Sequence, residues 1–224
     1  MKKPCFDAVI FDMDGTLLYT IDDMTTGVNL AMREFGFPTH TEKEVESYVN
    51  NGARRLIELA VPKEKCDEDT VSRVLERYLY HYGEHVCEKT YPYTGICEML
   101  SEITAAGVKC AVVSNKPDAA AKALVEKCFP AGTFAYVSGS GKDLPTKPDK
   151  ACTDKALAAM GLTGTAKVLY VGDSYVDVRM AKNAVLSMIG VLWGFAGENS
   201  FPEEQPDATV RTVEELTKYI MNGK

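Results

Sequence analysis

The sequence predicts an α/β fold, a doubly wound parallel sheet that carries an inserted all-helical domain. Short β-branched runs alternate with single helical patterns along most of the chain, and this alternation is typical of parallel sheets with right-handed crossovers. The rhythm breaks between about Asp22 and Cys87, where consecutive helical patterns occur without a strand signal. The 224 residues, 46% of them hydrophobic, suffice for one large domain or for one domain with an insert.

The first predicted strand is the apolar run at residues 5–11, and the helical insert follows it. Within the insert, residues 24–35 carry apolar side chains at helical spacing up to Gly36. Thr41 and Glu44 then fit the capping box that opens a second helix. Two further helical patterns, the first closed by a proline and the second long and amphipathic, lie at residues 50–62 and 71–82.

The remaining predicted strands alternate with helices. Their apolar runs lie at residues 108–113, 134–139, 167–172 and 187–193. One helix precedes them and stops at Gly107, a favoured C-cap residue, and another starts at Pro117, which suits a first helical turn. We therefore expect a core domain of residues 1–18 plus 88–224 and a helical domain of residues 19–87.

Composition excludes several classes of partner. A net charge of −7 and a pI near 5.1 argue against nucleic acid, whose binding proteins gather Lys and Arg. The apolar stretch after Lys3 contains Asp7 and ends at Asp12, so it cannot form a signal-peptide core. No run approaches the roughly 20 apolar residues of a membrane span. The seven cysteines are scattered and never form C-x-x-C, a pattern typical of reduced thiols in a cytoplasmic protein.

Two aspartates close the first predicted strand, in the stretch DMDGT. Side chains alternate along a strand, so Asp12 and Asp14 point roughly the same way. Like charges this close repel one another unless a proton or a cation accompanies them. Taken alone, the pair is equally consistent with a strand end followed by an Asp-Gly turn.

A second acidic group follows the run at residues 168–171, where Asp173 comes after Gly172 and Asp177 lies four residues further on. Ligands of open parallel sheets bind beyond the carboxyl ends of the strands. If the two strands are neighbours, Asp173 converges there on the first acidic pair, with Asp177 close by. Four carboxylates at one edge require positive charge, and such oxygen ligands select Mg²⁺ over zinc or copper.

Two more strand ends supply polar groups. Ser114 and Asn115 follow the second run, ahead of a helix N-terminus that favours an anion. Lys147, in the stretch LPTKPDK, could balance the acidic cluster and hold a phosphate. Each residue alone has a simpler explanation, a helix cap for Ser114 and a solvated loop for Lys147. The argument rests on the order Asp-x-Asp, Ser, Lys, Gly-Asp, with each group beside a strand.

In this order, DMDGT, VVSN, TKP and GDSYVD resemble the four motifs of haloacid dehalogenase superfamily phosphatases. The resemblance covers essentially the whole chain and implies a Rossmann-like core. The helical insert is similar to the small cap of the subclass that includes phosphoglycolate phosphatase and β-phosphoglucomutase. Its segment NNGARRLIELA resembles the cap segment of phosphoglycolate phosphatases.

The resemblance implies a hydrolase that acts on a small phosphorylated metabolite. Asp12 would attack phosphorus and form an aspartyl-phosphate. Asp14 would protonate the leaving oxygen and later deprotonate the hydrolytic water. Asp173, with Asp12 and the backbone carbonyl of Asp14, would hold Mg²⁺, and Asp177 would support this site directly or through water.

The remaining motif residues would bind the phosphate. Ser114 and the backbone amides near Gly15 would hold its oxygens, and Lys147 would neutralise the charge that develops on them. Thr16 and Asn115 lie beside these groups in the sequence and are expected to bind substrate with them.

Two arginines of the insert and several alternative functions stay open. Arg54 and Arg55 could pair with a carboxylate or a second phosphate of the substrate, or could lie on a solvated helix face. Asp14 argues against a dehalogenase, which has no alkoxide to protonate. A phosphomutase or pyrophosphatase would use the same core. A signalling receiver would be about half this length, with adjacent acids. The pattern leaves the oligomeric state open.

Overall fold

Six parallel strands form the central sheet, in the order β5-β4-β1-β6-β7-β8. The computed structural model describes residues 3–141, 145–202 and 204–223. The strands span Ala8–Phe11 (β1), Lys109–Pro117 (β4), Tyr136–Ser140 (β5), Val168–Gly172 (β6), Ser187–Val191 (β7) and Ala208–Val210 (β8). The predicted α/β architecture with a doubly wound, Rossmann-like sheet is confirmed.

Helices cover both faces of this sheet. They span Ile96–Ala105 (α5), Asp118–Cys128 (α6), Ala151–Ala159 (α7), Tyr175–Ala184 (α8) and Val213–Asn222 (α9), with a short 3₁₀ turn at Gly197–Asn199 (η2). In β1, Val9 and Phe11 join the apolar cluster that includes α5, α6 and α9, whereas Ala8 and Ile10 join the cluster that includes α7 and α8. Since both faces are buried, the strand is apolar at every position and shows no polar alternation.

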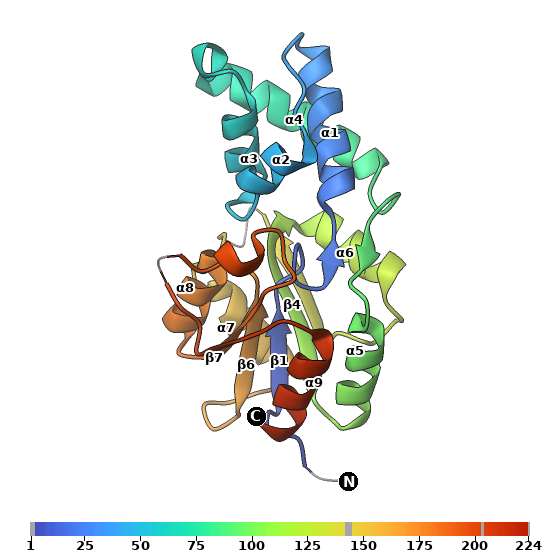
Figure 1. Cartoon of the computed structure of the whole chain (residues 1–224), viewed down its shortest axis with the longest axis vertical. Helices are drawn as coiled ribbons and strands as arrows, with labels where there is room; N and C mark the ends of the chain where they lie inside the picture. Colours follow the sequence, from blue (N-terminus) through green and yellow to red (C-terminus); the bar gives the residue numbers. More distant parts are fainter. Residues whose placement is uncertain (1–2, 142–144, 203, 224) are drawn as a thin grey trace.

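Four helices of the insert lie together beyond the carboxyl ends of the strands, toward which β1 points (Figure 1). They span Ile21–Glu34 (α1), Glu42–Tyr48 (α2), Gly52–Ala60 (α3) and Glu68–Glu84 (α4), with a 3₁₀ turn at Lys63–Lys65 (η1). The capping box predicted for Thr41 and Glu44 is present at the start of α2. The helices pack on one another through buried apolar side chains, among which the rings of Tyr78 and Tyr82 stack with their centroids 5.8 Å apart.

The chain crosses between sheet and insert at one place. The outgoing strand β2 (Leu18–Tyr19) pairs with the returning strand β3 (Tyr91–Pro92) in an antiparallel ribbon. The buried carboxylate of Asp23, at the start of α1, accepts hydrogen bonds from the backbone N–H groups of Lys89 and Thr90, both at 3.0 Å, and from the Thr90 hydroxyl at 2.7 Å. Both crossings are therefore tied to each other.

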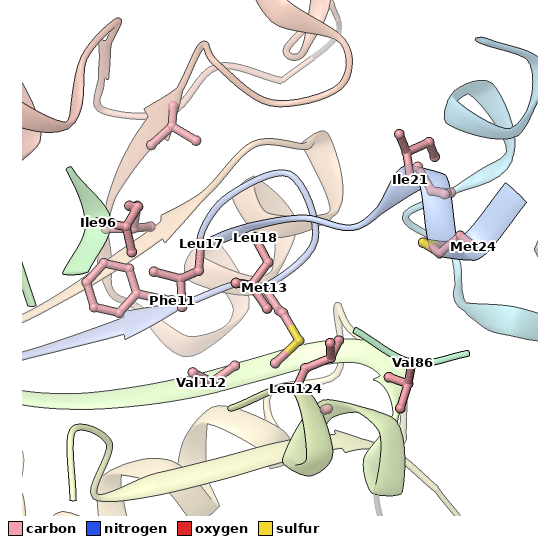
Figure 2. Close-up of a cluster of buried hydrophobic side chains, with 14 of the residues drawn as sticks. Phe11, Met13, Leu17, Leu18, Ile21, Met24, Val86, Ile96, Val112 and Leu124 are labelled. Atoms are coloured by element: carbon pink, nitrogen blue, oxygen red, sulfur yellow. The ribbon is translucent and has the colours of Figure 1, made fainter. Parts of the chain in front are cut away.

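Buried apolar side chains continue from the sheet to the insert along the outgoing crossing (Figure 2). Phe11 lies on the sheet, Met13 and Leu17 in the loop after it, and Ile21 at the first turn of α1, and all four are fully buried. The loop that carries Asp12 and Asp14 is therefore fixed by the packing of its apolar side chains in this cluster.

The structure differs from the predictions mainly at short or irregular elements. The ribbon strands β2 and β3 have two residues each and β8 has three, so none gave a readable signal. Strand β4 runs to Pro117 and not to residue 113, with a shift of register after Val113. Within the described part of the chain, no helix combines the length and the hydropathy needed to cross a membrane.

Candidate active site

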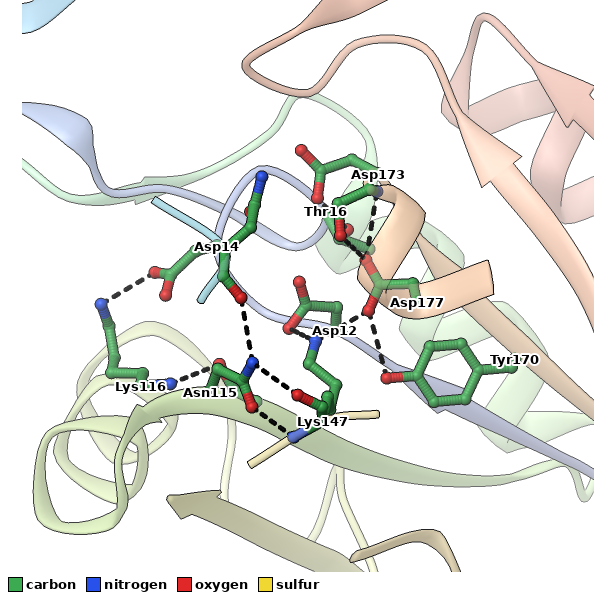
Figure 3. Close-up of polar contacts among 12 residues, drawn as sticks. Asp12, Asp14, Thr16, Asn115, Lys116, Lys147, Tyr170, Asp173 and Asp177 are labelled. Carbon is green, nitrogen blue, oxygen red and sulfur yellow. Dashed lines mark hydrogen bonds and ion pairs between the residues drawn. The ribbon is translucent and has the colours of Figure 1, made fainter. Parts of the chain in front are cut away.

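Three aspartates meet at the carboxyl ends of the neighbouring strands β1 and β6 (Figure 3). One carboxylate oxygen each of Asp12, Asp173 and Asp177 lies within 4.8 Å of the others. None of the three residues is more than 5% exposed. The backbone N–H of Asp12 donates to the Val171 carbonyl at 2.8 Å, so pairing of the two strands itself sets the spacing of the acids.

Lys147 lies inside this cluster. Its ammonium is 2.7 Å from Oδ1 of Asp12 and 2.7 Å from Oδ1 of Asp177, and its side chain is 2% exposed. Asn115 holds the lysine's backbone, since its Oδ1 accepts from the Lys147 N–H at 2.6 Å and its Nδ2 donates to the Lys147 carbonyl at 3.4 Å. The same Nδ2 donates to the Asn50 carbonyl of the insert at 2.9 Å. Asn115 thus joins the lysine loop to the insert.

Asp177 has partners on both of its oxygens. Its Oδ1 accepts from Lys147 and, at 3.3 Å, from the Tyr170 hydroxyl. Its Oδ2 accepts from the Ser174 hydroxyl at 2.6 Å and the Ser174 N–H at 3.1 Å, the capping box of α8. With this many donors around it, Asp177 is placed to orient Lys147 and the start of α8.

Negative charge is in excess in the cluster, because three buried carboxylates face one ammonium. Burial raises the pKa of Asp12 to about 7, although Lys147 opposes the shift. Burial, together with the charges of Asp12 and Asp177, holds the pKa of Asp173 well above its usual range. Burial alone would lower the pKa of Lys147, but Asp12 and Asp177 raise it above its usual range.

Asp173 has the features of a cation ligand. Its Oδ1 accepts from the Thr16 hydroxyl at 3.3 Å, while its Oδ2 is buried without a hydrogen-bond partner among the described residues. A Cβ at Gly15 or at Gly194 would collide with this carboxylate, so both glycines form a close cradle around it. A bound cation would satisfy the lone oxygen and offset the excess charge. The acidic cluster could therefore hold a metal ion.

Asp14 makes a separate ion pair on the other side of Asp12 in this view (Figure 3). Its Oδ1 is 2.9 Å from the ammonium of Lys116 and accepts from the Thr20 hydroxyl at 2.7 Å. The Lys116 ammonium also lies 4.7 Å from the ring centroid of Tyr82 in α4. Sequence reasoning missed Lys116. The available signal was its spacing, two residues beyond Ser114 and on the same side of β4 if that strand continues.

A cavity opens between this site and the insert. The core supplies charged and polar lining residues: Asp12, Asp14, Ser114, Asn115, Lys116, Lys147 and Ser174. The insert supplies a largely apolar wall: Met24, Val49, Ala53, Leu56 and Tyr78. Ser114 is buried beside the site, with its Oγ accepting from the Lys116 N–H at 3.2 Å. The insert thus covers the acidic edge of the sheet.

Four of the residues predicted to bind substrate have other contacts. Arg54 pairs with Glu58 and Glu68, and Arg55 pairs with Glu58, on an exposed face of α3 away from the cavity lining. The N–H groups of Gly15 and Thr16 donate to the carbonyls of Leu18 and Met13, so these two amides are not directed at a phosphate. Gly15, with φ of +78°, instead allows the loop to approach Asp173 closely.

The only tryptophan of the sequence touches the same loop. Nε1 of Trp193 donates to the Thr16 carbonyl at 3.0 Å. The fluorescence of this indole can therefore report changes in the loop that carries Asp12 and Asp14.

The parallel sheet, the buried acids beyond its strands and the cavity under the insert are the features expected of a hydrolase with a Rossmann-like core. The chain belongs to the haloacid dehalogenase-like hydrolases, whose family model matches residues 9–191.

Several relatives share nearly the full length of the chain. A phosphoglycolate phosphatase of Haemophilus influenzae is 31% identical over 209 residues, which cover 90% of this chain and 92% of that protein. A phosphoglycolate phosphatase of Agrobacterium fabrum is 29% identical over 221 residues, 98% of this chain and 94% of that protein. A crystal structure from Lactobacillus delbrueckii, provisionally assigned as a phosphoglycolate phosphatase, superposes with a TM-score of 0.89 at 30% identity. It covers 99% of this chain and 100% of that one. The chain is accordingly a phosphoric monoester hydrolase.

Proposed function

We propose that this phosphatase hydrolyses a small phosphorylated metabolite with the help of Mg²⁺, through an aspartyl-phosphate formed on Asp12. The observation that carries the proposal is the contact of Asp12 with Lys147 at 2.7 Å, beside an Asp173 oxygen that has no hydrogen-bond partner in the part of the chain that the structure describes. The ammonium favours the ionised form of Asp12, the form that acts as a nucleophile. Burial keeps this carboxylate poorly hydrated and therefore reactive.

The reaction divides between the two aspartates of the first loop. Asp12 attacks phosphorus while the bond to the leaving oxygen breaks, and Asp14 donates a proton to that oxygen. Asp14 then accepts a proton from the water that attacks the aspartyl-phosphate, which releases phosphate and restores Asp12. Ser114 and Lys147 line the cavity, where they would stabilise the charge on the transferring group.

The residues that would hold Mg²⁺ are Asp12 and Asp173, with the backbone carbonyl of Asp14. Oxygen donors of this kind match a hard divalent cation. Bound there, Mg²⁺ would supply positive charge to the phosphate oxygens. Asp177 has hydrogen-bond partners on both oxygens, so it supports the site by orienting Lys147.

The insert acts in this proposal as a cap over the leaving group. We divide the chain into a catalytic core, residues 1–18 plus 88–224, and a cap of residues 19–87. The apolar wall that α1 and α3 contribute to the cavity supports this division, as does the single ribbon that joins the two parts. The relatives' activity, together with the covered cavity, makes 2-phosphoglycolate the first substrate to test.

The experiment measures phosphate release from a panel of phosphorylated metabolites, with Mg²⁺ and with chelator. Wild type, Asp12→Asn and the control Asp69→Asn, an exposed aspartate of α4, are compared. Release that needs both Mg²⁺ and Asp12 supports the proposal. Absence of release from every compound refutes it, stable phosphorylation by acetyl phosphate indicates a receiver, and interconversion of sugar phosphates indicates a phosphomutase.

A further inference from the structure

Lys116 is a second buried ammonium in the cavity wall, distinct from the lysine of the acidic cluster. It lies near the carboxyl end of β4, and its side chain is 2% exposed. Among the described residues, its ammonium contacts one carboxylate, Asp14 at 2.9 Å, and the ring of Tyr82 at 4.7 Å. Lys147, by contrast, contacts two carboxylates. An ammonium has three N–H donors, so Lys116 can bind a further anion while keeping Asp14.

The position of Lys116 relates it to the leaving group. In the proposed reaction phosphorus lies beside Asp12, and the leaving oxygen lies beside Asp14, its proton donor. Lys116 contacts Asp14 and not Asp12, so it borders the part of the cavity that the leaving group enters. The insert lines this space with apolar side chains such as Met24 and Leu56. A cation in such surroundings strongly favours an anionic ligand.

We propose that Lys116 is the residue that selects substrates whose leaving group carries its own carboxylate, the phosphate esters of small hydroxy acids. This inference rests on the proposed function and adds the group that decides specificity. The substrate carboxylate accepts a hydrogen bond from the Lys116 ammonium and provides it with a second counter-ion. With an uncharged leaving group, that N–H donor has no acceptor in a wall shielded from water. Sites with such an unsatisfied buried donor discriminate strongly between substrates. The arginines of α3, being exposed, do not take this role.

The test compares 2-phosphoglycolate with ethyl phosphate, in which a methyl group replaces the carboxylate. Wild type should favour the first in kcat/KM by about 10² or more, and Lys116→Met should reduce this ratio to below about 10. Lys116→Arg, which keeps the charge, should retain part of the preference. Lys122→Met, on the exposed surface of α6, is the matched control and should keep the wild-type ratio. Circular dichroism and melting curves establish that each variant is folded.

A binding measurement keeps this inference separate from the proposed activity. In Asp12→Asn protein, calorimetric dissociation constants of both esters are measured with and without Lys116→Met. Preferential binding of 2-phosphoglycolate that disappears with the lysine supports the proposal, whether or not the wild type releases phosphate. Equal weakening of both esters, or the lack of any preference in the parent protein, overturns it. Failure of phosphate release alone counts against the proposed function only.

Discussion

We expect the buried Asp12 carboxylate to lower the stability of the protein in the presence of chelator, and its replacement measures by how much. Burial raises its pKa from 3.8 to about 7. One pKa unit corresponds to about 1.4 kcal/mol, so ionisation in the folded state costs at most about 4.5 kcal/mol. The folded state holds this proton more tightly than the unfolded chain. The penalty is therefore absent below pH 3.8, grows as the pH rises and is complete above pH 7.

Asp12→Asn should remove this penalty and abolish turnover together. Part of the gain is lost because Lys147 gives up one of its two carboxylate partners. We expect the free energy of unfolding in chelator at pH 8 to rise by about 1–3 kcal/mol, with kcat lower by at least about 10³-fold. The stability gain should shrink at pH 5, where the wild-type carboxylate is largely protonated.

Urea unfolding followed by circular dichroism, at both pH values, measures these differences. The control Asp69→Asn should match wild type at both. Added Mg²⁺ should stabilise wild type more than Asp12→Asn, because the variant lacks a ligand. The reasoning is refuted if Asp12→Asn is no more stable than wild type at pH 8, or if its advantage does not depend on pH.

Three further predictions concern the crossings, the loop and the insert. Asp23→Ala should lower the free energy of unfolding in urea by about 2–5 kcal/mol, because the buried donors of Lys89 and Thr90 lose their acceptor. The control Asp22→Ala removes a partly exposed carboxylate and should change this free energy by under about 0.5 kcal/mol. Equal effects of the two substitutions would contradict the role of Asp23 in tying the two crossings to each other. Gly15→Ala should weaken Mg²⁺ binding at least about tenfold in titrations of tryptophan fluorescence, because a Cβ displaces the carboxylate beside it. Wild-type affinity would argue against the cradle. Arg54→Ala and Arg55→Ala should each change kcat/KM by less than about threefold, as exposed ion pairs contribute little. A loss above about tenfold would place them at the substrate.

The sheet was predictable because strands buried on both faces are apolar at every position and stand out from their surroundings. Once β1 and β6 are neighbours, the convergence of Asp12 and Asp173 requires no further information. The ribbon strands and β8 are too short for periodicity to reveal, and they form because their partners are in place.

Contacts made only in the folded chain account for the differences at the site. The sequence did not indicate a role for Lys116 because β4 was expected to end before Ser114, whereas the strand runs to Pro117. For α3 the sequence did hold a signal. Leu56 and Ala53, three positions apart, face the cavity, whereas Arg54 falls on another side of the same helix. The resemblance of this segment to phosphoglycolate phosphatases does not by itself tell which side of α3 faces the cavity.

Because β2 and β3 form one ribbon at the base of the insert, the insert can be exchanged as a unit. Because Leu18 lies opposite Pro92, the chain leaves and re-enters the sheet domain at one hydrogen-bonded point. The entropy of closing such a loop grows only slowly with its length, so material between the two strands can lengthen, shorten or be replaced at little cost to the sheet. The apolar wall that the insert gives to the cavity can therefore change in evolution while the acids and Lys116 stay in place on the sheet domain. Grafting a foreign cap at this point is a route to altering the part of specificity that this wall decides.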